Sequence, residues 1–208
     1  GKHGPLYAAA GAKVTVVDLS ASMLDLDRQV ARERKLHVEL IQSSMDDLTM
    51  LKTDHFDLVI HPVSSCYLPS LINLFSEIAR ICRPSGLYLS QHKSPRSLQS
   101  SSQLNSNGRY ELLYPESYPA AHPRALPPAP PSRLRELGTD EFVHSLTDIL
   151  GGICQAGFHV EDFFEPCEFK EESSVGSYAH RAAFLPPYIR ILARKGSSQA
   201  ILQSLVVQ

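Results

Sequence analysis

The sequence predicts an α/β protein built on a doubly wound, parallel sheet. Two observations carry this prediction. Short apolar segments alternate with amphipathic ones between residues 5 and 91, which is the order expected when helices cross over between parallel strands. In addition, the apolar segment 14–17 ends directly at the carboxylate of Asp18, which places an acid where open α/β sheets bind ligands.

The composition is ordinary for a globular domain and argues against several classes of protein. The chain has 208 residues, of which 43% are hydrophobic and 20% charged, enough for one domain with a proper core. A formal net charge of −2 gives no electrostatic reason to bind nucleic acid. No apolar run reaches the ~18 residues of a membrane span, and no segment resembles a signal peptide. We therefore expect a cytoplasmic protein.

The cysteines give no sign of a metal centre. They lie far apart, without a CxxC motif or a Cys/His spacing suited to zinc: Cys66, Cys82, Cys154 and Cys167. We expect buried thiols in a reducing compartment and no bound metal.

The chain begins with glycines that lead into a helix. Gly1 and Gly4 precede a short Ala-rich helix, for which Pro5 suits the first turn and Gly11 the C-terminal stop. A glycine loop at a helix N-terminus can bring backbone N–H groups close to a ligand, although such loops are common.

Asp18 closes the first strand. Val and Thr at 14–17 favour extended backbone, and the carboxylate can accept two hydrogen bonds from a ribose diol. Ser20 suits the N-cap of the next helix. A simple turn role for Asp18 is the alternative, but the segments on either side favour a nucleotide site.

Further helices and strands follow in alternation as far as residue 91. They are expected at 21–35 (helix), 37–42 (strand), 56–60 (strand), 70–83 (helix) and 87–91 (strand). A polar loop at 43–48 follows the second strand, a helix near 48–53 is short or missing, and the turn 83–86 ends the second long helix.

The alternation then lapses at 92–137, a Ser- and Pro-rich insert that we expect to lie over the active site. Residues 115–131 alone hold seven of the fifteen prolines. Regular structure should return with a helix that begins at 139–141 and ends at Gly157, followed by two strands at 158–164 and 187–194. The predicted organisation is a single domain over 1–195 and an irregular tail over 196–208.

These segments together resemble the class I S-adenosylmethionine-dependent methyltransferases, especially the type 11 group. The resemblance covers nearly all of residues 1–195 and is carried by 14–20, 56–60, the Arg-Pro-Ser-Gly turn at 83–86 and the helix that ends at Gly157. It implies a Rossmann-like fold with a C-terminal antiparallel strand. It also implies S-adenosylmethionine as the cofactor and methyl transfer to an acceptor, which we expect to be a small molecule.

The resemblance further implies which residues bind the cofactor. Asp18 would hold the ribose hydroxyls, the 44–46 loop would cradle adenine, and the loop 61–67 would face the methionine part and the acceptor. Ser44 stands where the family usually has Asp. The full implied set is Gly1, His3, Gly4, Asp18, Leu19, Ser44, Met45, Asp46 and His61.

One family element has no counterpart in this sequence. The family's first strand lies at the middle of the sheet, and its neighbours would lose N–H and C=O partners without it. The sequence therefore predicts a methyltransferase fragment truncated before or within the glycine-rich motif. We expect these 208 residues alone to be unstable or aggregated.

Methyl transfer from a sulfonium needs orientation and the exclusion of water, and it needs a base only where the acceptor starts protonated. The candidate catalytic residues are His61, Tyr67 and His92, because each follows a strand at the ligand-binding edge. For each of them, a hydrogen-bonded structural side chain is the alternative. His180 and Arg181 either reach the acceptor or are solvated.

Two other functions remain open. A nicotinamide-dependent oxidoreductase would use Asp18 for its ribose equally well, but the chain has no Tyr-x-x-x-Lys pair of the kind that short-chain dehydrogenases use. A catalytically inactive, methyltransferase-like interaction module is the other.

Overall fold

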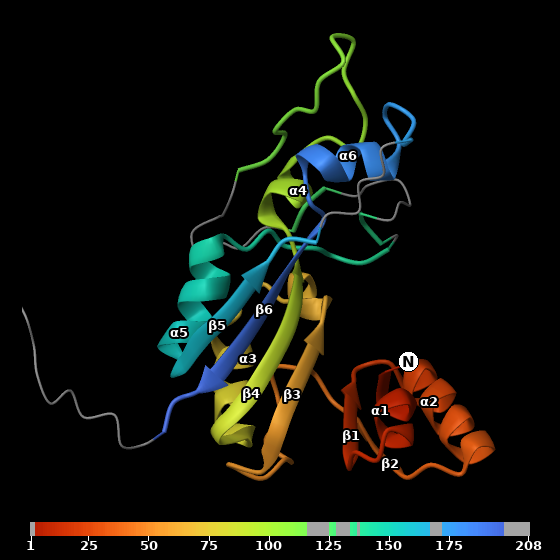
Figure 1. Cartoon of the computed structure of the whole chain (residues 1–208), viewed down its shortest axis with the longest axis vertical. Helices are drawn as coiled ribbons and strands as arrows, with labels where there is room; N and C mark the ends of the chain where they lie inside the picture. The colour runs from red at the N-terminus through yellow and green to blue at the C-terminus, as the bar shows by residue number, and fades with distance from the viewer. Residues whose placement is uncertain (1–2, 116–124, 128–133, 137, 167–171, 198–208) are drawn as a thin grey trace, which may run out of the picture. The chain divides into compact units, whose positions relative to one another are not determined.

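The computed structural model describes residues 3–115, 125–127, 134–136, 138–166 and 172–197. The chain forms two compact units, Gly1–Leu51 (unit 1) and Lys52–Gln208 (unit 2), which are described separately below (Figure 1). Gly1 and most of the predicted tail lie outside the described residues. Predictions about them stay predictions, as does the division into one domain with an insert and a tail.

Unit 1 is a two-stranded sheet with two helices. Its elements are α1 (His3–Ala9), β1 (Val14–Asp18), α2 (Ala21–Arg34) and β2 (Val38–Gln42). The strands pair in parallel, with Asp18 opposite Gln42. Parallel pairing places both carboxyl ends at one edge of the sheet, so Asp18 lies beside the loop that follows β2.

Local sequence signals account for these elements. The Ser20 hydroxyl accepts the Met23 N–H at 3.3 Å and starts α2, while Gly11 ends the first helical segment with a φ of +93°. Gly4 is buried within α1, close to β1. A Cβ at this position would lie 2.5 Å from Val16 Cγ2, which leaves no room for a side chain. Glycine thus lets α1 pack closely on β1.

A run as short and apolar as residues 14–17 is expected to form a strand buried on both faces of a parallel sheet, but β1 is not fully buried. All five residues of β1 are half-buried. Within the described part of the chain β1 hydrogen-bonds to β2 alone, and β3 likewise has one paired edge. That a further strand belongs beside these edges stays a prediction.

Unit 2 holds the larger sheet. Its elements are β3 (Phe56–Pro62), the 3₁₀ helix η1 (Ser64–Tyr67), α3 (Ile72–Ile81), β4 (Cys82–Lys93), α4 (Pro95–Gln99), the π-helical segment η2 (Thr147–Gly151), α5 (Gly152–Gln155), β5 (Phe158–Phe164), α6 (Tyr178–Phe184) and β6 (Tyr188–Lys195). The strand order is β3-β4-β6-β5, with β3 and β4 parallel and β6 antiparallel to both of its neighbours.

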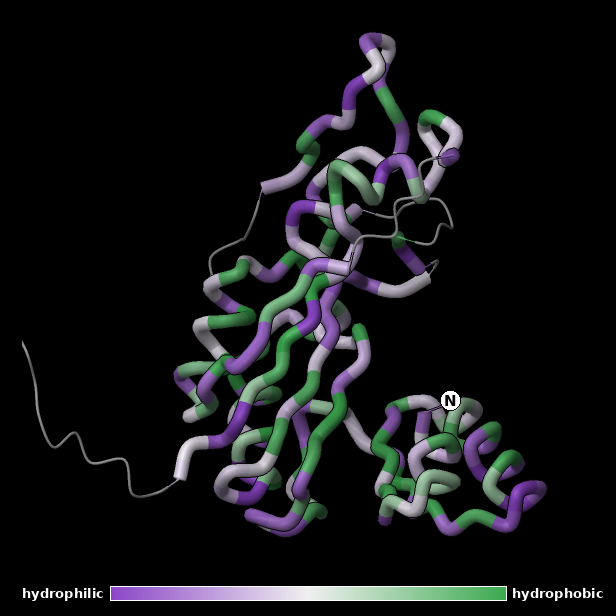
Figure 2. Tube along the Cα trace, viewed as in Figure 1, coloured by the Kyte–Doolittle hydropathy of each residue, from purple (hydrophilic) through white to green (hydrophobic). Residues whose placement is uncertain are grey.

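This topology confirms an α/β fold with a mixed sheet and a C-terminal antiparallel strand. The described strands form two sheets rather than one, so the complete doubly wound order is not seen. Apolar residues concentrate along the strands of the larger sheet (Figure 2). The apolar side of α3 supplies much of the core of unit 2, with Leu74, Phe75 and Ile78 at most 3% exposed.

α3 ends at Ile81, before the turn predicted at 83–86, and that turn lies within β4. Phe56 pairs with Cys82 and Leu58 pairs with Leu87, so residues 83–86 lie opposite the single residue Asp57 and form a bulge. Ser85 has a φ of +62° at this bulge.

The helix start predicted at 139–141 is wrong. Helical structure begins after Ser145, whose hydroxyl accepts the Asp148 N–H at 3.1 Å while Asp148 Oδ2 accepts the Ser145 N–H at 2.9 Å. Glu141 instead binds Lys93 in the interior. The prediction also missed α6, which Ser177 caps by accepting the His180 N–H.

A chain of polar side chains lies in the core of unit 2. His61 is hydrogen-bonded to the Tyr88 hydroxyl at 2.9 Å through Nδ1, and to Ser64 at 2.9 Å through Nε2. His92 is hydrogen-bonded to Ser65 at 2.7 Å and to the Ser90 hydroxyl at 3.0 Å. Burial lowers the pKa of His61 to about 4 and the pKa of His92 well below its ordinary value, because a buried imidazolium loses its water.

Alanine substitutions at two adjacent glycines, Gly151 and Gly152, test how η2 and α5 pack on α3. Gly151 and Gly152 both have helical backbone angles, so alanine gains up to about 1 kcal/mol of helix propensity at either. A Cβ at Gly152 would lie 2.7 Å from the buried Phe75 ring, but at Gly151 the nearest atom is Thr147 Cγ2 at 3.8 Å. Urea unfolding should show Gly151→Ala as stable as the parent or more so. Gly152→Ala should lose about 1–3 kcal/mol, and equal effects would contradict this packing.

The buried histidines predict a loss of stability in acid. At a pH well above 6.5, the ordinary histidine pKa, both rings are neutral whether the chain is folded or unfolded. As the pH falls from 6.5 towards 4, the unfolded chain binds protons that buried His61 and His92 do not bind. The free energy of unfolding should therefore fall by up to about 1.4 kcal/mol per pH unit for each histidine.

Urea unfolding at pH 7.5 and 5 measures this slope. His61→Gln should reduce it, whereas His55→Gln, at an exposed histidine just before β3, should not. A stability that is flat between these pH values would contradict the assignment of neutral, buried rings.

Candidate functional site

Asp18 stands at the carboxyl end of β1 with one oxygen already fixed. Its Oδ1 accepts the Ser20 N–H at 2.8 Å. Its Oδ2 has no hydrogen-bond partner among the residues that the structure describes. The backbone around it is tied to the end of β2, since the Ser43 N–H donates to the Asp18 carbonyl at 3.2 Å and Gln42 Nε2 donates to the Leu19 carbonyl. The carboxylate is thus oriented and can accept further hydrogen bonds.

The loop after β2 lies beside this carboxylate and is organised from within. The Ser44 hydroxyl donates to Asp46 Oδ1, and the Ser43 hydroxyl donates to the Asp47 carbonyl at 2.9 Å. Ser44, Met45 and Asp46 are each half-buried. The predicted residues Asp18, Leu19 and 44–46 therefore come together at one edge of the unit 1 sheet.

The other predicted cofactor residues are placed differently. His3 is exposed in the first turn of α1, whereas Gly4 is buried against Val16. Gly1 lies outside the described residues. His61 belongs to unit 2, where it is buried near the end of β3.

The three catalytic candidates lie near the carboxyl ends of β3 and β4. The rings of His61 and His92 meet edge to face with centroids 5.6 Å apart. Both nitrogens of each ring are hydrogen-bonded, and Ser64 and Ser65 of η1 are among the partners. Two neutral, fully engaged imidazoles are typical of side chains that hold structure together.

Tyr67, in η1, is half-buried, and Lys93 Nζ lies over its ring at 5.7 Å from the centroid. Burial and the nearby Glu136 carboxylate raise the pKa of Tyr67, so its phenol stays protonated. It can donate a hydrogen bond but is poorly suited to act as a base. Burial likewise raises the pKa of the neighbouring Cys66 thiol to about 12, which agrees with an unreactive buried cysteine.

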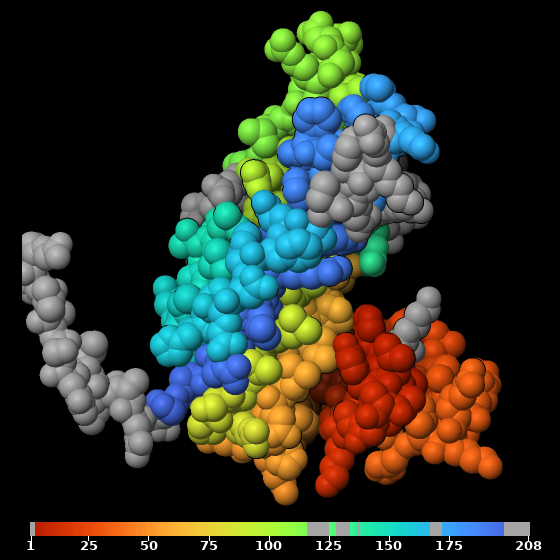
Figure 3. All heavy atoms as spheres, viewed as in Figure 1, coloured from red at the N-terminus to blue at the C-terminus, as the bar shows by residue number. Residues whose placement is uncertain are grey.

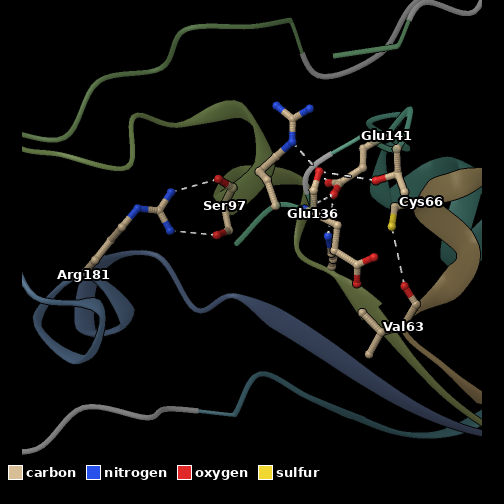
Figure 4. A network of polar contacts seen from close by, with 9 residues as sticks. Val63, Cys66, Ser97, Glu136, Glu141 and Arg181 are labelled. Atoms are coloured by element: carbon tan, nitrogen blue, oxygen red, sulfur yellow. Dashed lines mark hydrogen bonds and ion pairs between the residues drawn. The ribbon is translucent and has the colours of Figure 1, made fainter. Parts of the chain in front are cut away.

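Sequence reasoning missed a buried charged cluster beside Tyr67. Lys93 Nζ and Glu141 Oε1 are 2.9 Å apart, with side chains 7% and 0% exposed. Arg135 Nε lies 3.3 Å from Glu141 Oε2, and the Glu136 N–H donates to Oε1 at 2.9 Å. Figure 4 shows Glu136 and Glu141 gathered close to Cys66. The pairing joins residues 48 positions apart, so no local pattern announces it.

Arg181 is buried rather than solvated, which settles one alternative left open by the sequence. Its guanidinium donates to the Ser97 hydroxyl and the Ser97 carbonyl, each at 2.8 Å (Figure 4). It also donates to the Ser101 carbonyl at 2.9 Å. Nearby, the Tyr110 hydroxyl and His180 Nδ1 are 3.0 Å apart. The space-filling view shows α6 against the segment that contains Tyr110 (Figure 3). Arg181 thus fastens α6 to α4.

The described residues show neither a metal centre nor a transmembrane helix. Within them, no group of three or more His, Cys, Asp or Glu side chains could hold a metal ion. None of the helices in the described ranges is long and apolar enough to cross a membrane.

Comparisons with known proteins agree with the resemblance noted in the sequence. Residues 1–90 match a family model described as a methyltransferase domain. The chain is also similar to an uncharacterized methyltransferase, YbaJ, of Bacillus subtilis (strain 168). The two are 34% identical over 173 residues, which cover 79% of this chain and 64% of that relative. The chain therefore spans just under two thirds of the relative's length.

Solved structures show the same fold at low sequence identity. An S-adenosylmethionine-dependent methyltransferase from Mesorhizobium loti superposes with a TM-score of 0.64 at 17% identity, covering 88% of this chain and 80% of that one. A counterpart from Methanosarcina mazei gives 0.65 at 15% identity, covering 95% and 89%. The chain thus shares the fold of these solved structures, and its first 90 residues match a methyltransferase domain.

Proposed function

We propose that the protein transfers a methyl group from S-adenosylmethionine to an acceptor whose identity is open. The observation that carries the proposal is the Asp18 carboxylate, which has one oxygen fixed by the Ser20 N–H and lies at the sheet edge beside the 44–46 loop. A ribose diol offers two hydroxyl donors, and a carboxylate accepts both. The residues present thus fit the nucleoside part of this cofactor.

Each unit then has a part in the proposed reaction. The bound cofactor supplies a methyl group already activated on sulfur. Asp18 would hold its ribose, and Met45, half-buried in the loop, would contact its adenine. In unit 2, η1 would face the methyl acceptor. Because His61, His92 and Tyr67 are uncharged and engaged with neighbours, their part would be to orient groups and exclude water.

The insert at 92–137 would cover the acceptor side, as the sequence suggests. Support comes from a small core cluster in which Leu98 and Leu126, both from the insert, pack with Cys66 and Val143, and in which Tyr67 also takes part. Parts of the insert therefore lie directly on η1. We also propose that β1 to β4 belong to a single doubly wound sheet.

Asp18→Ala tests the ribose assignment. Removing a charged acceptor of hydrogen bonds costs about 1.5–3 kcal/mol, so the Kd for S-adenosylhomocysteine should rise roughly 10- to 150-fold. Isothermal titration calorimetry measures it, with circular dichroism to show that the variant is folded. Asp25→Ala, at an exposed α2 residue that pairs with Arg28, is the matched control and should bind as the parent does.

Three outcomes separate the functions that the sequence left open. Tight binding of S-adenosylhomocysteine that depends on Asp18 supports the methyltransferase. Binding of NADH in its place would indicate the oxidoreductase. A folded parent protein that binds neither would indicate the inactive interaction module, and an unchanged Kd in Asp18→Ala would reject the ribose contact.

A further inference from the structure

We propose that the buried Lys93–Glu141 ion pair positions η1, acting as a latch between the end of β4 and the segment 141–144. Lys93 and Glu141 are thus positioning residues for the turn that carries Tyr67. The acceptor-facing role of η1 rests on the proposed function above, whereas the latch itself rests on contacts within unit 2 alone.

The first support is the set of contacts made by residues 141–144. The Phe142 N–H donates to the Cys66 carbonyl at 2.7 Å, and His144 Nε2 lies 2.9 Å from the Leu68 carbonyl. Val143 packs against Cys66 in the small core cluster. Three consecutive residues therefore contact η1 or the residue after it, and Glu141 precedes all three.

The second support is that Glu141 is the point at which this segment reaches the sheet. Its carboxylate, fully buried, meets Lys93 at the last position of β4. Its backbone carbonyl accepts the Leu126 N–H at 2.6 Å. Lys93 in turn lies over the Tyr67 ring. One ion pair thus connects β4, the 141–144 segment and η1.

The third support is energetic. A buried ion pair is seldom more stabilising than an apolar pair of similar volume, because both charges lose their water. Its specific effect is to favour one arrangement over others, since neither charge can be left unpaired in the interior. Here, the arrangement that keeps Lys93 and Glu141 paired is the one that holds η1 beneath residues 141–144.

Cysteine labelling can detect the latch without knowledge of the acceptor. Cys66 in η1 and Cys82 at the start of β4 are both buried. In a Cys154→Ser/Cys167→Ser background, only these two thiols can react with 5,5′-dithiobis(2-nitrobenzoate). Peptide mass spectrometry after quenching then gives a labelling rate for each. Cys66 reports local opening of η1, and Cys82 reports loosening of the sheet.

Lys93→Met should raise the labelling rate of Cys66 at least tenfold while that of Cys82 stays within twofold. A pair that only contributed to global stability would raise both rates by the same factor, and that result would overturn the proposal. An unchanged Cys66 rate would overturn it as well.

The neutral double variant Lys93→Met/Glu141→Gln keeps the test decisive if the single variant fails to fold. It removes both charges, and the glutamine oxygen can still accept the Glu136 N–H. Stability should recover relative to Glu141→Gln, which leaves Lys93 buried without its carboxylate partner, but Cys66 should stay at least tenfold more reactive than in the parent. Recovery of Cys66 protection together with stability would reject the latch.

A second ion pair, at the other end of β4, serves as the matched control. Lys195 Nζ donates to the Cys82 carbonyl at 2.7 Å and pairs with Asp54. Lys195→Met should therefore speed the labelling of Cys82 and leave Cys66 unchanged. Because labelling is measured without any ligand, failure of the latch and failure of cofactor binding are separate results.

Discussion

Unit 2 depends on β4, which is hydrogen-bonded along both edges, to β3 in parallel and to β6 in the opposite direction. Such a strand has little freedom to shift, and its side chains alternate between two faces. Tyr88, Ser90 and His92 share one face and join the buried polar chain. Lys93, of opposite parity, ends the strand and meets Glu141. The register of one strand thus determines where both polar clusters lie.

Two buried cations among the described residues of unit 2, Lys93 and Arg181, are accommodated in different ways. Lys93 is neutralised by Glu141, with Arg135 close by. Arg181 has no carboxylate partner among the described residues. It donates to carbonyl oxygens of Ser97 and Ser100 in and just after α4, where a helix end leaves such oxygens unpaired. Lys93 holds the segment 141–144 to the end of β4, and Arg181 holds α6 to the short helix α4. The two interactions give fixed positions to parts of the chain that have little regular structure.

In unit 1, the proposed cofactor-binding residues Asp18, Leu19 and 44–46 are held in place mainly by local contacts. Parallel pairing of β1 with β2 brings Asp18 next to Gln42, and a few backbone bonds hold the two following loops together. The residues concerned lie within a short stretch of chain. This is why the acid, the N-cap at Ser20 and the polar loop could all be identified from sequence patterns, and why the resemblance to a known family rests on them.

The sequence by itself determined the elements whose signals are local: Ser20 as a helix cap, Gly11 and Gly157 as stops with positive φ, and the apolar face of α3. Only the tertiary structure decided the partners of Glu141 and Arg181. Both have sequence contexts that also suit a helix start or a solvated surface. Their burial depends on cations, hydroxyls and carbonyls contributed from 48 and from about 80 residues away. Burial of a charge requires such partners, and it is folding that brings them together.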